Sequence, residues 1–255
     1  MLTSAEITAW LGQFIWPLFR CAAALWLMPI FGGRGVPRHT RLALVCALAV
    51  LVSEQLPPIE PVNPLSPQAI LLTIEQVLIG LTFGMIIQLL FTVFTLAGRI
   101  MSMQMGLSMA VMNDPSNGPG IPLLGKWLET LVALLFLSID GHLVVIRVLA
   151  ESFHSMPIGL GLNSNDFLDV ALLGGWLFSG ALLVAIPAVF SMLLVNLCFG
   201  VMSRAASQLN IFALGFPMTM LFGMFTLMLV LSSLPDVFLQ MTEITLGLLR
   251  SFSGA

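Results

Sequence analysis

Three apolar segments of this chain are each longer than a membrane crossing requires. Residues 67–112 form a stretch of 46 residues with no proline after the first position. As one helix this stretch would extend roughly 69 Å, at about 1.5 Å per residue, whereas a bilayer core is about 30 Å thick. Residues 166–202 and 216–250 would each reach roughly 50 Å. Either these helices break, the first of them near Gly98, or they stand partly outside the membrane.

Charged residues are too scarce to cover a water-soluble surface. Charged residues make up 8% of the 255 residues, and hydrophobic residues make up 58%. In soluble domains about 25% of residues are charged and roughly 45–50% are hydrophobic. The composition predicts an all-α, integral membrane-type protein with long helical hairpins, or a subunit sheathed by partners. The net charge of −3, without a basic run, argues against nucleic-acid binding.

Shorter apolar segments predict three more helices, at residues 7–31, 41–56 and 123–150. Basic residues at 34, 38 and 41 follow the first of them. Because cytoplasmic loops carry an excess of Arg and Lys, we expect this loop in the cytoplasm. Six crossings would then place both termini outside and the loop around Arg204 inside.

Ionisable residues inside apolar segments are costly and so are candidates for a specific role. Arg20 and Glu75 are two such residues. We expect each to be held by polar partners, either in this chain or across a subunit boundary, as an ion pair or hydrogen-bonded anchor. An ion pathway is the weaker interpretation, because the acidic residues are scattered over different segments.

The sequence 140–142, Asp-Gly-His, resembles a catalytic motif only superficially. An aspartyl protease needs two converging aspartates, and a serine hydrolase needs a nucleophile in a motif such as Gly-x-Ser-x-Gly, which the chain lacks. A turn at a helix end is the favoured interpretation. The histidines and the three cysteines show no metal-like spacing, so we expect no enzyme activity, metal or cofactor.

Methionines lead into a glycine- and proline-rich loop. Met101, Met105, Met109 and Met112 have the spacing of one helix face. Core packing is the common use of such a face, but methionine also adapts to a changing partner. The loop at residues 113–122 cannot satisfy its backbone in lipid, so it must line water or protein. This combination suits a movable plug.

Small residues recur at four-residue spacing on the third segment. Gly80 and Gly84 form one pair, and Gly98, Ser102 and Gly106 repeat the pattern. Such spacing lets helices pack closely.

Several stretches resemble the FliR/SctT family of the flagellar and virulence type III export gate, and the similarity covers nearly the whole chain. They are WPLFR at 16–20, PIFGGRGVP at 29–37, EQVLIG at 75–80, QMGL at 104–107, DP at 114–115, FLSIDGH at 136–142, NLCFG at 196–200, RAASQLNIF at 204–212 and GFP at 215–217. One departure is Ser207, where the resemblance leads us to expect proline. The match is nearer to the flagellar branch.

The resemblance implies a function in protein export from the bacterial inner membrane, within the flagellar basal body. One copy of such a protein assembles with several copies of FliP and FliQ into a helical export gate for unfolded flagellar proteins. Residues 1–165 would be FliP-like, and residues 166–255 would be a FliQ-like hairpin. FlhB is expected near the hairpin loop that contains Arg204, Gln208 and Asn210.

The resemblance also implies that residues 106–122 form a plug that blocks the pore until substrate arrives. The plug residues are Gly106, Asn113, Asp114, Pro115, Gly118, Pro119, Gly120 and Pro122, and Met105, Met109 and Met112 would pack at its base. A secondary transporter for a small solute or ion remains the alternative, although no inverted repeat is evident. An intramembrane hydrolase is disfavoured by the missing nucleophile.

Overall fold

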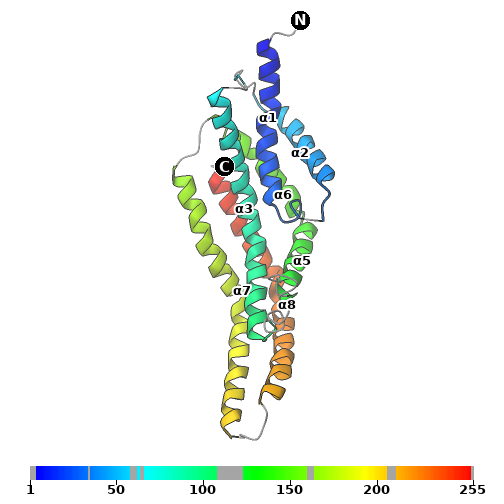
Figure 1. Cartoon of the computed structure of the whole chain (residues 1–255), viewed down its shortest axis with the longest axis vertical. Coiled ribbons are helices and arrows are strands. Elements are labelled where there is room, and N and C mark those ends of the chain that lie inside the picture. The colour runs from blue at the N-terminus through cyan, green and yellow to red at the C-terminus, as the bar shows by residue number, and fades with distance from the viewer. Residues whose placement is uncertain are drawn as a thin grey trace. The chain divides into compact units, whose positions relative to one another are not determined.

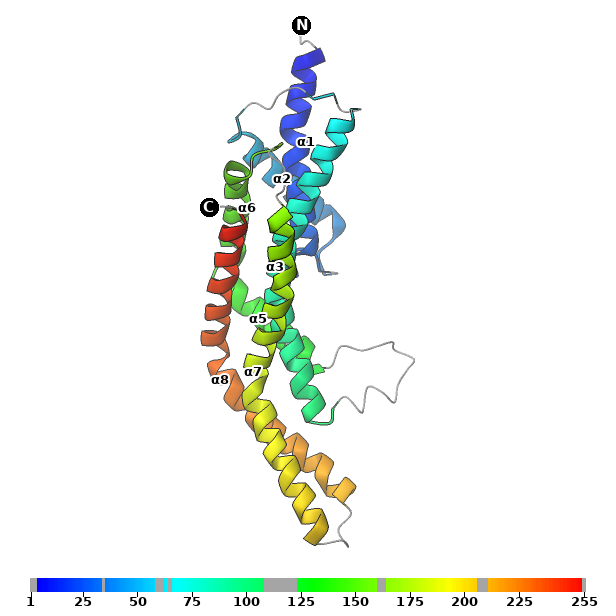
Figure 2. The same cartoon turned by 90° about the vertical axis from the view of Figure 1, so that its left-hand side faces the viewer.

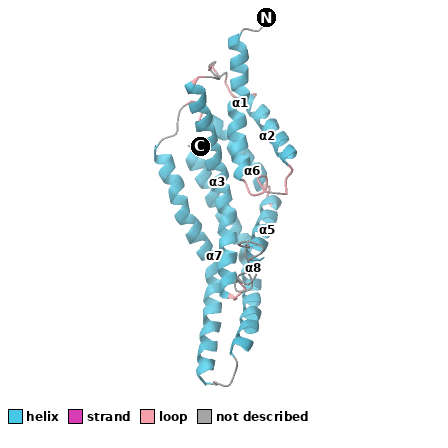
Figure 3. Ribbon diagram, viewed as in Figure 1, coloured by secondary structure: helices cyan, strands magenta, loops and turns pink. Residues whose placement is uncertain are grey.

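Every regular element in the computed structural model is a helix. The model describes residues 4–33, 35–57, 62–63, 66–107, 123–159, 164–205 and 211–253, and these contain no strand (Figures 1 and 3). The helices are α1 (Ser4–Leu27), α2 (Arg38–Ser53), α3 (Pro67–Gln104), α5 (Leu123–Ser138), α6 (Gly141–Ser155), α7 (Ser164–Ala205) and α8 (Ile211–Ser253). The all-α prediction is confirmed.

The third apolar segment forms one continuous helix. α3 has 38 residues and passes Gly98 without a break, so it is about 57 Å long at about 1.5 Å per residue. Of the two alternatives for this segment, the unbroken helix is therefore the one observed. The helix ends at Gln104, and residues 108–112, where the apolar pattern continues, lie outside the described residues.

The fourth apolar segment is not the single span that its composition suggests. It divides into α5 and α6, which form a bent pair. Asp140 lies between them in the left-handed region, with φ of 55°, and an L-residue in that region cannot continue a right-handed helix. The turn predicted at residues 140–142 is thus confirmed. The Asp140 side chain makes no capping hydrogen bond to α6.

α7 and α8 are the longest helices and form an antiparallel hairpin (Figures 1 and 2). They have 42 and 43 residues, so each is roughly 64 Å long. Pro187 lies inside α7, and Pro217 and Pro235 lie inside α8, without ending either helix.

Three helices in the described part of the chain are long and apolar enough to cross a membrane. They are α3, residues Ala171–Met202 of α7 and residues Pro217–Phe252 of α8, and the α5–α6 pair passes the same test as one bent span. α1 and α2, which the apolar pattern predicts as spans, are not among them.

The chain packs into two compact units whose segments alternate along the sequence. The first contains Met1–Leu89, Ile139–Gly174 and Ile244–Ala255, and the second contains Leu90–Ser138 and Gly175–Glu243. In the first unit α1 and α3 approach closely, because a Cβ on Gly84 would lie 2.5 Å from the Ala24 carbonyl oxygen. The second unit has a core of ring contacts, with the Phe91 and Phe136 centroids 5.4 Å apart. The predicted division into a FliP-like part at residues 1–165 and a FliQ-like part at residues 166–255 is a different one, and it stays a prediction.

Candidate functional site

A completely buried arginine joins three helices of the first unit. Arg20 of α1 donates from Nε to Oε1 of Gln76 on α3, at 2.8 Å. Its Nη1 donates to the carbonyl oxygen of Ser152 on α6 at 3.1 Å and to the Ser152 hydroxyl at 3.3 Å. Its Nη2 donates to the carbonyl oxygen of Met156 at 3.0 Å. The expectation that polar partners hold Arg20 therefore agrees with its surroundings, and these partners lie in the same chain.

Two further interactions favour the charged form of this guanidinium. The Arg20 Cζ lies 4.1 Å from the centroid of the Phe153 ring, a geometry in which the ring face attracts a cation. Glu75 also attracts it electrostatically. The four hydrogen bonds described above join the guanidinium to neutral groups, and Glu75 adds a charge attraction. The cluster is therefore a hydrogen-bonded anchor rather than a simple ion pair.

Gln76, Ser152 and Phe153 were not singled out from the sequence. Ser152 and Phe153 are more than 130 positions from Arg20, and nothing local indicates such a contact. The one available signal is Gln76, a polar residue next to Glu75 on an otherwise apolar helix. Its Nε2 atom is buried and has no hydrogen-bond partner among the described residues.

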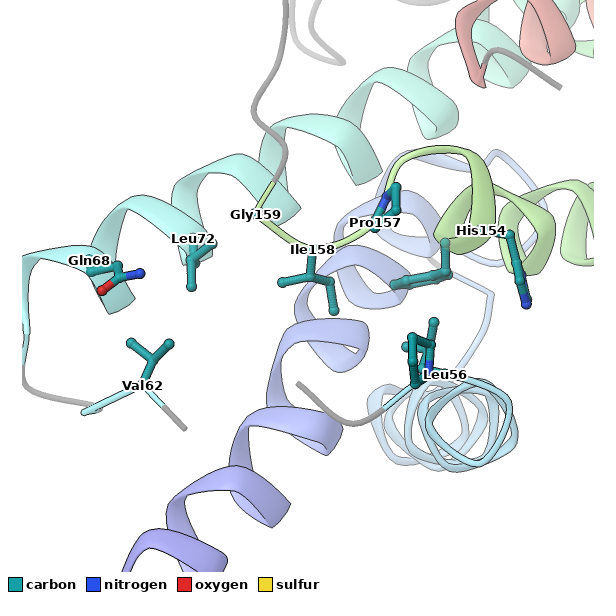
Figure 4. A pocket seen from close by; sticks show the side chains of 10 residues that line it. Leu56, Val62, Gln68, Leu72, His154, Pro157, Ile158 and Gly159 are labelled. Atoms are coloured by element: carbon teal, nitrogen blue, oxygen red, sulfur yellow. The ribbon is translucent and has the colours of Figure 1, made fainter. Parts of the chain in front are cut away.

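A cavity of about 440 Å³ lies beside this cluster in the same unit. Figure 4 shows Val62, Leu72 and Ile158 converging on it. Phe153, which covers Arg20 on one side, lines the cavity as well. Among the described lining residues only Gln68 and His154 carry polar side chains. That lining brings together no acid–base pair.

In the second unit, α3 ends in a defined C-terminal capping motif. Gly106 has φ of 74°. Its N–H bonds the Met103 carbonyl at 3.1 Å, and the Leu107 N–H bonds the Ser102 carbonyl at 3.1 Å. This pair of bonds around a left-handed glycine is the Schellman motif, which satisfies the last carbonyls of a helix. Gly106 therefore ends α3 where the loop begins.

The methionine face is buried at this helix end. Met101 and Met105 are each 2% exposed, whereas Met103 is 64% exposed. The prediction that these methionines share one helix face is thus supported for its two described members, Met101 and Met105. Met109 and Met112 lie outside the described residues, as do the loop positions Asn113, Asp114, Pro115, Gly118, Pro119, Gly120 and Pro122.

The helices on the two sides of this loop touch backbone to backbone. A Cβ on Gly98 of α3 would lie 2.7 Å from the Gly125 Cα and 2.9 Å from the Leu124 carbonyl oxygen, both on α5. A Cβ on Gly125 would lie 3.0 Å from the Thr95 carbonyl oxygen. Only glycine allows this approach, so the stem of the loop is closed by a rigid contact.

Of the predicted hairpin-loop residues, only Arg204 is described. It is exposed in the last turn of α7, and Gln208 and Asn210 lie outside the described residues. Among the described residues no group of three His, Cys, Asp or Glu side chains could hold a metal ion.

The model of the family described as "Bacterial export proteins, family 1" matches residues 11–244. The chain belongs to this family. The match includes Arg20, the close approaches at Gly84 and Gly98, and nearly all of the hairpin. The resemblance seen in the sequence motifs is therefore confirmed.

Curated relatives from several bacteria carry the name "Flagellar biosynthetic protein FliR". The protein from Pectobacterium carotovorum subsp. carotovorum is 37% identical over 92% of this chain and 91% of its own length. The protein from Escherichia coli (strain K12) is 37% identical over 87% of this chain and 85% of its own length. The protein from Bacillus subtilis (strain 168) is 26% identical over 93% of both chains.

Proposed function

We propose that this chain is a subunit of the flagellar type III protein export gate. With FliP and FliQ it would form the channel through which unfolded flagellar proteins cross the inner membrane at the basal body. The observation that carries the proposal is the family match over residues 11–244, together with relatives named for flagellar biosynthesis over about nine-tenths of the chain. The protein would act by assembly and passage of substrate, without catalysing a reaction.

The long hairpin supports assembly with other subunits. In the most apolar stretch of α7 only 22% is buried within the chain, and in the most apolar stretch of α8 only 33% is buried. Both helices are about twice as long as a bilayer core is thick, so lipid alone cannot cover them. Exposed apolar side chains of α7 include Phe178, Leu182, Ile186, Phe190, Leu194 and Leu197. Neighbouring subunits would cover this surface where the hairpin extends beyond the lipid.

Residues 106–122, which we call the gate loop, would be the plug of the closed channel. Two observations support this role. The Schellman motif at Gly106 ends α3 at the start of the loop, and the Gly98–Gly125 contact closes its stem. A loop held at both ends can change conformation while its flanking helices stay in place.

The two parts of the chain would resemble different partners. Residues 1–165 would take the place of a FliP-like subunit, and residues 166–255 would take the place of a FliQ-like hairpin. FlhB would bind near the hairpin loop that contains Arg204, Gln208 and Asn210. The Arg204 side chain is exposed and therefore accessible to a partner.

Co-purification from membranes tests the assembly. We expect a tagged chain, extracted in mild detergent, to elute as a large hetero-oligomer that contains FliP and FliQ homologues. A stable monomer or dimer without them would contradict the proposal and favour a secondary transporter for a small solute or ion.

A further inference from the structure

We propose that a pocket between α1 and α2 receives a basic side chain, arginine or lysine, from a neighbouring subunit of the assembled gate. The inference rests on the proposed function, because only an assembly provides such a neighbour. The pocket has a volume of about 430 Å³ and is lined by Trp10, Gln13, Phe14, Val50, Ser53 and Glu54. All six residues belong to the first compact unit.

Two helix faces meet at this pocket. α1 and α2 lie side by side (Figures 1 and 2). The lining positions are 10, 13 and 14 on α1 and 50, 53 and 54 at the end of α2, and each set has the spacing of one helix face. The Nε2 of Gln13 donates to the carbonyl oxygens of Ser53 at 3.1 Å and Leu56 at 3.4 Å. The two helices are thus joined by hydrogen bonds at the pocket itself.

The α2 side of the pocket is electrostatically negative. Glu54 is exposed, and its carboxylate has no salt bridge to any of the described residues. Glu54 is also the C-cap of α2, and a helix C-terminus carries a partial negative charge of about half an elementary charge. The last turn of α2 contains no basic residue that would offset it. The pocket therefore attracts a cation and repels an anion.

The α1 side of the pocket is aromatic. Trp10 and Phe14 line it from this helix. The face of an aromatic ring attracts a cation, and tryptophan does so most strongly. Arginine also stacks on aromatic rings and binds carboxylates through its planar fork of donors. An apolar occupant would instead take water away from Glu54 without replacing its hydrogen bonds, which is costly.

A protein side chain suits this pocket better than a lipid headgroup does. Headgroups that contain an ammonium group also contain a phosphate a few bonds away, which Glu54 and the end of α2 would repel. Trp10 is 77% exposed in the isolated chain, although tryptophan and arginine are the residues most enriched at the energetic centres of protein interfaces. A basic residue of a neighbouring subunit would cover Trp10 and pair with Glu54 at the same time.

Conservative substitutions test the two parts of the pocket in the full chain. Glu54→Gln removes the charge, and Trp10→Leu keeps an apolar side chain but removes the ring. Each should lower the amount of partner subunits that co-purify with the tagged chain at least about threefold. Trp10→Phe should lower it less, because a phenyl ring still attracts a cation. Unchanged co-purification in Glu54→Gln or in Trp10→Leu would overturn the proposal.

Matched controls come from residues outside the pocket. Trp26 is 70% exposed on the same helix as Trp10, and Glu151 is exposed on α6. Neither of them lines the pocket. Trp26→Leu and Glu151→Gln should therefore retain the partner subunits, with the amount of each variant in the membrane measured in parallel.

A photoreactive side chain identifies the occupant. Val50 lines the pocket and is 44% exposed, so benzoylphenylalanine in its place would lie at the interface. In cells that carry the full gate, we expect light to join this position to a peptide of another gate subunit that contains arginine or lysine, as determined by mass spectrometry. A bond only to lipid, to a second copy of this chain or to a peptide without a basic residue would overturn the proposal.

Charge reversal then tests the pairing. Glu54→Arg should lower co-purification at least about tenfold, because like charges at an interface repel strongly. Replacing the identified basic residue of the neighbouring subunit by glutamate should restore it. Glu151→Arg is the control and should have no such effect. Failure of the double reversal to restore co-purification would contradict a direct pairing with Glu54.

The gate function and the pocket can fail separately. If the unmodified chain co-purifies without FliP and FliQ homologues, the proposed function itself is wrong. If it brings them along and every pocket variant brings the same amount, the gate function stands and the pocket receives no basic side chain.

Discussion

The Nε–H of Arg20 donates a 2.8 Å hydrogen bond to Oε1 of Gln76, and both side chains are completely buried. This bond joins α1 to α3, and the other guanidinium donors reach α6 and the residue that follows it. A cation in an apolar interior is stable only when such partners surround it. These contacts explain how a buried arginine is accommodated, and they join three helices.

We expect Arg20→Met to destabilise the purified complex by about 3 kcal/mol, because the buried acceptors on Gln76 and Ser152 lose their donor. Arg20→Lys should be nearly as destabilising as Arg20→Met, since one ammonium group cannot replace the planar guanidinium with its several N–H donors. Thermal unfolding of the detergent-solubilised complex measures the effect. Lys126→Ala is the control, because its ion pair with Glu129 is largely exposed and such pairs contribute about 0–1 kcal/mol.

Neighbouring residues on α3 should differ in importance. Gln76→Leu removes the acceptor for Arg20 Nε and should cost about 1–3 kcal/mol. Glu75→Gln keeps the size of a half-buried side chain and removes a charge attraction, so its cost should be smaller. Glu75→Ala should still lower assembly more than it changes gate selectivity. The amount of complex in membranes measures both, and equal losses for Gln76→Leu and Glu75→Gln would contradict the assignment of Gln76 as the main partner.

Gly80 should be intolerant of even one added carbon. A Cβ there would collide with the Arg20 carbonyl and lie 2.9 Å from the Ala23 Cβ, so Gly80→Ala forces α1 away from α3. Overpacking of this kind costs about 1–3 kcal/mol. Gly174→Ala meets open space and should be neutral or slightly stabilising, because alanine favours helix. The melting temperature of the complex should fall in Gly80→Ala and stay the same or rise slightly in Gly174→Ala.

Much of the fold follows from the apolar pattern, because apolar length and proline position determine where long helices can run. The all-α class and the unusual lengths of α3, α7 and α8 were predictable in this way, whereas the turn at Asp140 was predicted from the Asp-Gly-His sequence. The break between α5 and α6 was underestimated, because the surrounding residues are apolar on both sides and the left-handed conformation of Asp140 has little signal in composition.

The site was less predictable, because its contacts join distant positions. Arg20 was found from its cost in an apolar segment, but its partners Gln76 and Ser152 were not. The close approach at Gly84 follows the four-residue spacing of small residues, whereas Gly223 belongs to no such pattern and its contact with Met105 appears only in three dimensions. Glycines on α8 cannot be ranked without knowing what packs against them.

Shortening the gate loop is the most direct test of the proposed gate. Residues 113–120 would be deleted, leaving Gly106 and the Gly98–Gly125 stem in place, so assembly should stay intact. The measurement is ion conductance or solute uptake in cells expressing the shortened chain, with the amount of assembled complex determined in parallel. We expect resting cells to leak small ions or solutes because the pore has lost its seal. Normal assembly with an unchanged leak would show that this loop does not close the channel.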